Sequence, residues 1–234
     1  MRPHITDPHQ RLQNALDTLD ATFAPLSDLP FTVGGCTYCY AESDLQVLAG
    51  PVHLVPEDLI PHVAHEATNH WDDFPGLYRR LTPRIVRALT EGRLLHDMVA
   101  SRYLAAGWRD WPASERAALE EVWQAWWRSA LHMHPGTTAR TTTRIIDVLE
   151  TLAVTTGTLK PWLAVWAETR TDAADRHLED ALDTWLIEDD IADLQLGFYD
   201  EVYAAPELLR WLCSLERGRV GATQLREIER IVLG

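Results

Sequence analysis

The sequence of 234 residues has little of several features that mark common protein classes. It contains no apolar run near the roughly 18 residues that span a bilayer. Residues 1–10 carry two prolines and two histidines where a secretory signal peptide needs an apolar stretch. Lys160 is the only lysine among 21 basic residues, a bias typical of a high-GC bacterial genome. We therefore expect a cytoplasmic protein that is not embedded in a membrane.

Cysteine is also scarce, with three in the chain. Only Cys36 and Cys39 lie close together, which argues against the disulfide framework of a small secreted protein and predicts reduced thiols. Cys213 lies among tryptophan and leucine residues, so we predict a buried thiol there.

The chain lacks the glycine-rich loop that binds phosphate in nucleotide-binding proteins, and it lacks the serine elbow of the α/β-hydrolases. No segment alternates apolar and polar residues with a period of two, so no strand order of an α/β enzyme is predicted. These absences favour a non-enzymatic role.

The net charge is strongly negative, −14 at pH 7. Nucleic-acid binding depends mainly on neutralising phosphates with basic side chains, so we expect no nucleic-acid partner. The middle of the chain is more basic, and Arg80, Arg84 and Arg87 fall on one side of a predicted helix. We favour the interpretation that the three arginines pair with acidic segments of the same fold. The alternative is that this arginine face binds an acidic protein partner.

Helix signals occur along the whole chain. Asp7-Pro8 and Thr82-Pro83 each place a capping residue before a proline, which is the pattern of a helix N-terminus. A first helix is predicted over 8–23 and another over 56–71. Further amphipathic stretches lie near 83–91, 93–106, 114–133, 141–156, 159–169, 172–187, 206–217 and 223–233.

The connections between these stretches are short, as between antiparallel helical neighbours. We therefore predict an all-α fold in which residues 1–234 form one helical domain, an irregular helical bundle. A HEAT-like helical solenoid is the alternative, because the segments around Gly107 and Gly157 loosely resemble each other.

Ten tryptophans are present, and the spacing of Trp123, Trp126 and Trp127 is that of the apolar stripe of one helix. This spacing predicts core packing rather than a surface for sugars or bases. Trp108 and Trp111 lie between predicted helices, and we predict that they form exposed aromatic platforms.

The segment 24–75 is predicted to bind a metal. Cys36 and Cys39 are separated by two residues and follow Gly34-Gly35, so both thiols can point at one soft cation while the backbone amides approach the sulfurs. The spacing predicts zinc or another soft divalent metal. A closed tetrahedral site needs two further ligands.

Histidines that can supply these ligands follow within 31 residues of Cys39. We favour His70, which lies at the end of the helix predicted over 56–71. His65 is the predicted fourth ligand, although its spacing to His70 requires the last helical turn to loosen. His62 or Glu66 are substitutes for His65.

Two other interpretations compete for these residues. A redox-active pair of the thioredoxin type follows a strand in an α/β fold, and no such strand is predicted here. His65, Glu66 and His70 also resemble a metalloprotease helix with one residue inserted, but the inserted residue moves the second histidine off the shared face.

The residues Cys36-Thr-Tyr-Cys39, Val55-Pro-Glu-Asp-Leu59 and His70-Trp-Asp72 resemble those of uncharacterised bacterial proteins predicted to be helical. The resemblance covers mainly residues 31–90 and assigns no function. It implies that His70, rather than His62 or His65, accompanies the two cysteines.

The main hypothesis is a non-enzymatic helical interaction or scaffold module stabilised by a structural Cys2His2 zinc site, which would order the loop 24–56. A metal-dependent enzyme with one open coordination position and Glu66 as general base is the second hypothesis. An adaptor that binds an acidic protein through its arginine face is the third. Nothing in the sequence indicates the oligomeric state.

Overall fold

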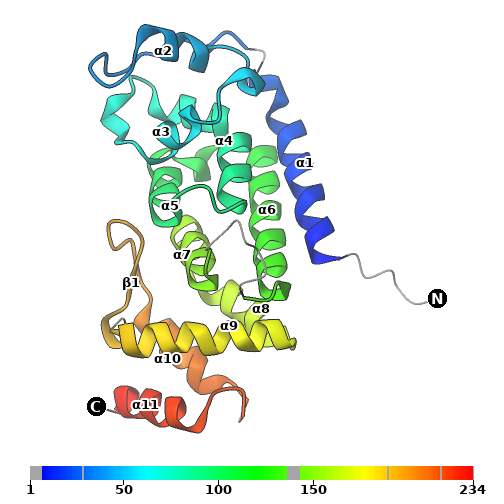
Figure 1. Cartoon of the computed structure of the whole chain (residues 1–234), viewed down its shortest axis with the longest axis vertical. Helices are drawn as coiled ribbons and strands as arrows, with labels where there is room; N and C mark the ends of the chain where they lie inside the picture. The colour runs from blue at the N-terminus through cyan, green and yellow to red at the C-terminus, as the bar shows by residue number, and fades with distance from the viewer. Residues whose placement is uncertain (1–6, 28, 136–142, 189, 217, 234) are drawn as a thin grey trace, which may run out of the picture. The chain divides into compact units, whose positions relative to one another are not determined.

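The computed structural model describes residues 7–27, 29–135, 143–188, 190–216 and 218–233 (Figure 1). These residues are mainly helical and include a single two-stranded sheet, which confirms the all-α class. The chain packs as two compact units, residues 1–126 and 127–234, and each is described by itself. One domain over 1–234, and a bundle rather than a solenoid, stay predictions. Among the described helices, none is long and apolar enough to cross a bilayer.

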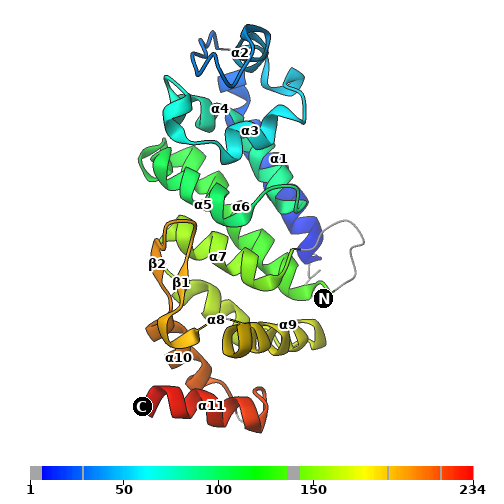
Figure 2. The ribbon, with the colours of Figure 1, turned by 60° about the vertical axis from the view of Figure 1, so that its left-hand side comes forward.

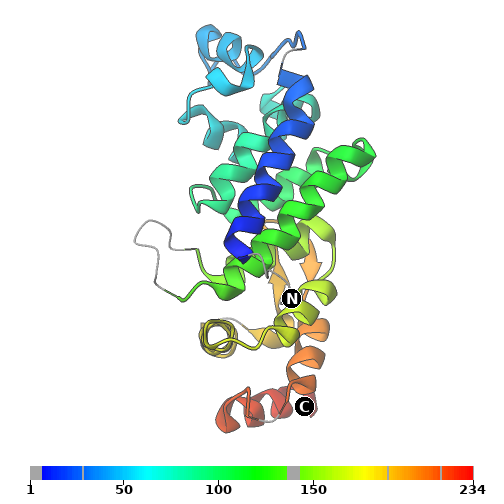
Figure 3. The same cartoon turned by 90° about the vertical axis from the view of Figure 1, so that its right-hand side faces the viewer.

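The first unit contains α1 (Pro8–Ser27), α2 (Glu42–Ala49), η1 (Val52–Leu54), α3 (Leu59–His65), η2 (Thr68–His70), α4 (Phe74–Thr90), α5 (His96–Ala105) and η3 (Trp108–Asp110), and most of α6 (Ala113–His132). The η elements here are single 3-10 turns. Both α1 and α3 pack against α4 (Figure 3), so α4 is the centre of this unit.

Helix α4 begins well before Pro83, where the sequence predicted a helix start. Its N-terminus is capped by Asp73, whose Oδ1 accepts the Gly76 N–H at 2.9 Å. Pro83 removes one backbone hydrogen bond inside the helix. The complete burial of Tyr78 and Leu81 in the core outweighs that loss, because tertiary packing supplies most of the stability of a helix.

The helix predicted over 56–71 is interrupted, because α3 ends at His65. The carbonyl oxygens of His65 and Glu66 accept from the Arg102 guanidinium at 3.3 and 2.7 Å, and Glu66 Oε1 accepts the Ala67 N–H at 3.2 Å. These partners satisfy groups that a continuing helix would have bonded internally. The chain then turns through η2, so His70 does not continue the helical spacing of α3.

The second unit contains the end of α6 and α7 (Ile145–Thr156), α8 (Lys160–Glu168), α9 (Asp172–Asp183), η4 (Thr184–Glu188), η5 (Ile191–Asp193), β1 (Gln195–Leu196), β2 (Val202–Tyr203), α10 (Ala205–Ser214) and α11 (Ala222–Leu233). The two short strands pair antiparallel, Gln195 with Tyr203, and the hairpin lies beside α7 (Figure 2). The helix predicted over 172–187 corresponds to α9 followed directly by the π-helical turn η4. The first residues of the helix predicted over 141–156 lie outside the described residues.

Arg219 closes the C-terminal end of α8. Its side chain is 4% exposed and donates to the carbonyl oxygens of Trp166, Ala167 and Thr169 at 3.1, 2.9 and 2.8 Å. A helix C-terminus leaves carbonyl groups without intrahelical partners, and the guanidinium supplies them.

Tryptophan packing is partly as predicted. Trp123, Trp126 and Trp127 are buried, which confirms the core assignment. The prediction of exposed platforms at Trp108 and Trp111 is wrong, because both are buried; Trp111 Nε1 donates to the Ala106 carbonyl at 3.1 Å. An indole can leave a loop for the core when its N–H finds a backbone acceptor.

The prediction of a buried thiol at Cys213 is also wrong. Helix α10 turns Trp211 and Leu212 inward and leaves the Cys213 side chain exposed. Apolar neighbours in the sequence therefore did not predict which side of this helix is buried.

Candidate metal centre

The cysteine loop is joined to the His70 segment by an antiparallel bridge between Gly35 and Trp71. The Cys36 N–H donates to the His70 carbonyl at 2.9 Å, and on the other side of the bridge the Asp72 N–H donates to the Gly34 carbonyl at 3.0 Å. In this register Cys36 lies opposite His70. Side chains at opposite positions of an antiparallel pair lie on the same face, with their Cβ atoms roughly 5 Å apart.

The close approach of these two segments depends on the glycine at position 35. A Cβ atom there would lie 2.9 Å from the His70 carbonyl oxygen and 3.2 Å from Cε3 of Trp71. The Trp71 ring in turn packs on Tyr40, with ring centroids 4.5 Å apart. Both rings are buried, so they anchor the cysteine loop to the unit's core.

The two thiols belong to one tight turn, in which the Cys39 and Tyr40 N–H groups donate to the Cys36 carbonyl at 3.1 and 3.0 Å. The backbone N–H groups of Cys39 and Tyr38, followed by the contact with the Cys39 thiol, lower the pKa of Cys36. The same thiol contact raises the pKa of Cys39. Amide hydrogen bonds to a sulfur favour its thiolate form, which is the form that ligates metals.

Glu66 contacts His70 and also Tyr40, the residue that follows the cysteine turn. Glu66 Oε1 is 3.5 Å from His70 Nδ1, while Oε2 accepts from the Tyr40 hydroxyl at 3.2 Å. The negative charge of Glu66 raises the pKa of both cysteines, and this is the weakest of the effects that act on them. The buried His70 Nδ1 makes no hydrogen bond within the described parts of the chain.

His65 is not brought to this group. Its Nε2 accepts the Leu95 N–H at 2.9 Å, at the start of α5, and burial lowers the pKa of its imidazole. The reason is that α3 ends at His65. A turn and the short η2 element, rather than a continuous helix, connect His65 to His70. The predicted fourth ligand therefore faces a different part of the unit.

The structure places Cys36 and Cys39 in one turn, sets Cys36 opposite His70 and puts Glu66 beside His70. Cys36, Cys39 and His70 were favoured from the sequence. As the side chains stand, no three histidine, cysteine, aspartate or glutamate side chains in the described ranges form a group that could hold a metal ion. A metal site at these residues would therefore require their side chains to rotate. The chain matches no family model, curated protein or solved structure.

The arginine face, the alternative site for an acidic partner, is largely used inside the unit. Arg80 is 4% exposed, donates to the Leu26 carbonyl, and also donates to the carbonyl oxygens of Ser27, Leu29 and Gly50 at 2.8, 3.1 and 3.0 Å. Its guanidinium thus holds the end of α1 against the loop that follows α2.

The other two arginines also pair within the first unit. Arg84 donates to the Val52 carbonyl at 3.0 Å and to Glu57. Arg87 Nη2 lies 2.9 Å from Asp17 and 2.6 Å from Asp20, both on α1. All three arginines therefore make contacts inside the first unit, as the internal-pairing interpretation of the sequence expects.

Sequence reasoning missed two parts of this region. The first is the pair of packed rings, Tyr40 and Trp71, that supports the cysteine turn. The second is Arg102, which donates to the Glu66 carbonyl at the C-terminal end of α3. The only local signal was the aromatic residue that directly follows each of Cys39 and His70. The Arg102 contacts join α5 to the end of α3, and no local pattern encodes them.

Proposed function

We propose that residues 24–75 bind zinc or a similar soft divalent cation through Cys36, Cys39, His70 and Glu66. In this proposal Glu66 takes the position that the sequence assigned to His65. The observation that carries it is the register of the bridge, which sets Cys36 opposite His70.

The donor set fits such a cation. Two thiolates, one imidazole and one carboxylate match the ligands that zinc prefers. The His70 Nδ1 atom lacks a hydrogen-bond partner among the described residues, although it is buried, and a metal would satisfy it. Tyr40 donates to Glu66, and a hydrogen bond of this kind orients a ligating carboxylate.

We further propose a structural role for the site in a non-enzymatic interaction module. Four protein ligands close a tetrahedral zinc site and leave no position for substrate. The metal would tie the cysteine turn to η2 and order the loop between α1 and α3. The turn carries Tyr38, which is 97% exposed and would be presented rigidly to a protein partner.

The test is elemental analysis of protein purified without chelator. We expect stoichiometric zinc in the wild type, and its loss in Cys36→Ser and in His70→Ala. Cys213→Ser is the matched control, because it removes an exposed thiol of the second unit and should leave the metal content unchanged. Wild-type protein without stoichiometric metal, or Cys36→Ser protein that retains it, contradicts the proposal.

X-ray absorption at the zinc edge distinguishes the structural role from the enzymatic one. We expect two sulfur and two nitrogen or oxygen scatterers, and Glu66→Gln should change the light-atom shell. Retention of a solvent ligand in the wild type would instead support a metal-dependent enzyme with an open position.

A further inference from the structure

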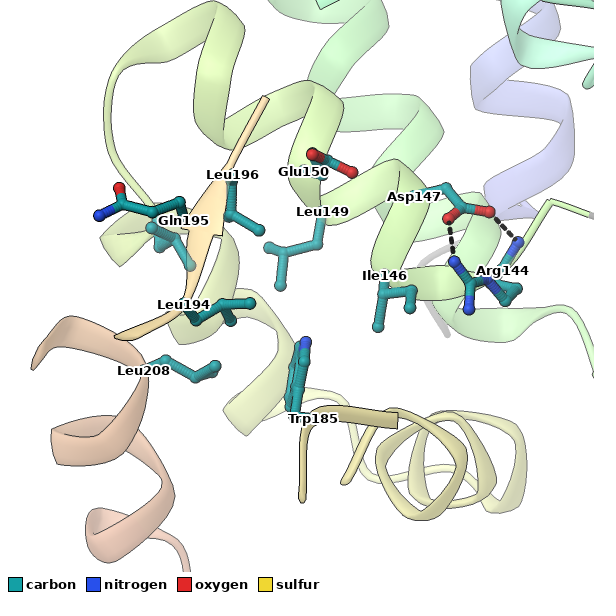
Figure 4. Close-up of a pocket in the computed structure, with 11 residues that line it drawn as sticks. Arg144, Ile146, Asp147, Leu149, Glu150, Trp185, Leu194, Gln195, Leu196 and Leu208 are labelled. Atoms are coloured by element: carbon teal, nitrogen blue, oxygen red, sulfur yellow. Dashed lines mark hydrogen bonds and ion pairs between the residues drawn. The ribbon is translucent and has the colours of Figure 1, made fainter. Parts of the chain in front are cut away.

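The second unit contains a cavity that the proposed metal site does not involve. Its volume is about 210 Å³. Figure 4 shows the side chains that line it. Its walls come from α7, the π-helical turn η4, the segment that leads into β1, and α10. The apolar part of the lining includes Leu149, Leu194, Leu196, Leu208 and Trp185.

Trp185 is the most informative residue in this wall. It lies on η4, and π-helical turns occur frequently at functional sites. Its ring packs edge-on against Trp166, with centroids 6.3 Å apart, and its indole nitrogen points towards Leu149 and Ile146 across the cavity (Figure 4). This N–H makes no hydrogen bond to a described residue, and because its nitrogen is not fully buried it faces the open volume of the cavity.

The charged groups at the cavity are already engaged with the protein. Arg144 Nη2 lies 3.2 Å from Asp147 Oδ1, and the Arg144 N–H donates to Asp147 Oδ2 at 2.8 Å. Glu150 Oε1 accepts the Gly197 N–H at 2.6 Å and so fastens the hairpin to α7. One guanidinium and two carboxylates give the lining a net negative charge, which disfavours an anionic ligand.

We propose that this cavity binds a neutral molecule the size of a single ring, with an apolar body and one hydrogen-bond acceptor. An apolar cavity of about 150 Å³ is sufficient for benzene, so 210 Å³ accommodates a ring with a small substituent. The ring lies among the leucines and the acceptor takes the Trp185 N–H. Such a ligand packs against the leucines and accepts the Trp185 N–H in place of solvent.

Acetophenone is a suitable probe, because it combines one ring with a neutral carbonyl acceptor. The protein is labelled with 5-fluorotryptophan, and the Trp185 signal is assigned in the 19F NMR spectrum as the one absent from Trp185→Phe. We expect a saturable shift of this signal on titration. Ethylbenzene, which lacks the acceptor, should bind about five- to tenfold more weakly, and benzoate should not bind.

Two variants separate the cavity from non-specific binding. Leu196→Phe fills the cavity from β1 and should abolish the shift, while Leu233→Phe adds the same ring at an exposed position of α11 and should not. Acetophenone should bind to Trp185→Phe only as tightly as ethylbenzene binds to the wild type, measured by ligand-observed NMR. A non-saturable shift overturns the proposal, and so does one that persists in folded Leu196→Phe protein. Equal affinities for acetophenone and ethylbenzene also overturn it.

Discussion

Arg79 and Glu115 form a bidentate ion pair in which both nitrogen–oxygen distances are 2.6 Å. The pair joins α4 to the first turn of α6, and the Glu115 side chain is 9% exposed. A carboxylate this well covered depends on its partner, since an isolated buried charge is strongly unfavourable.

Replacing Arg79 by Ala therefore should lower the free energy of unfolding by about 2 kcal/mol, less than for a fully buried pair because the arginine is 32% exposed. Urea denaturation measures the change. Arg230→Ala, which removes an arginine that is 72% exposed, is the comparison variant and should cost clearly less. A double-mutant cycle with Glu115→Ala should give a coupling energy above about 0.5 kcal/mol, which is the lower bound for residues in one network. A coupling energy near zero would contradict the dependence of Glu115 on Arg79.

The carbonyl cluster around Arg80 leads to a second prediction. Arg80→Met keeps the aliphatic stem but leaves the carbonyl groups of Ser27, Leu29 and Gly50 without their donor. We expect a loss of about 2–4 kcal/mol in the free energy of unfolding, measured in urea. Arg93→Met removes an arginine that is 44% exposed and pairs with exposed acids, and should cost less than about 1 kcal/mol.

Gly35 provides a test of the bridge that does not alter any proposed ligand. Gly35→Ala places a Cβ atom 2.9 Å from the His70 carbonyl oxygen, so the two segments must separate. We expect lower zinc content and a lower Tm in the same variant. Gly221→Ala is the control, because the nearest atom to its new Cβ is the end of the flexible Gln224 side chain. Full zinc occupancy in Gly35→Ala would show that ligand placement does not depend on the bridge.

His177 predicts a pH dependence of stability. Burial lowers the pKa of its imidazole below the ordinary 6.5, and donation to the Met133 carbonyl at 2.7 Å offsets this only in part. The folded state then binds fewer protons than the unfolded chain, so protonation favours unfolding. The stability associated with neutral His177 is present above pH 6.5 and is lost as the pH falls below it.

The measurement is the Tm of the wild type and of His177→Gln between pH 8 and pH 5. Glutamine keeps a donor for the Met133 carbonyl and has no charge to gain. The Tm should fall less with acidity in the variant than in the wild type. Parallel curves would mean that His177 is not among the groups that set the acid sensitivity.

The sequence predicted the helical class and the tryptophan core because both depend on spacing within one helix. Trp123, Trp126 and Trp127 show this most clearly, since their burial follows from periodicity alone. The cysteine turn was also predictable, because a glycine-flanked pair of thiols is a local feature.

The features that the sequence did not reveal depend on contacts between distant segments. The end of α3 is set by Arg102, which is 36 residues from Glu66 in sequence, and this contact decides that His65 faces α5. The arginine spacing gave the correct face of α4 but could not show that Arg80 is covered by the end of α1. Likewise, the lining of the cavity comes from separate elements and has no signature in any one of them.

The carbonyl contacts of Arg80, Arg102 and Arg219 give the near absence of lysine a structural meaning. Each guanidinium reaches several carbonyl oxygens in different directions. An ammonium group is a compact point charge that cannot spread its donors over the same width. A variant with lysine at these three positions would keep its formal charge. The carbonyl groups at the C-terminal ends of α1, α3 and α8 would nevertheless lose hydrogen-bond donors.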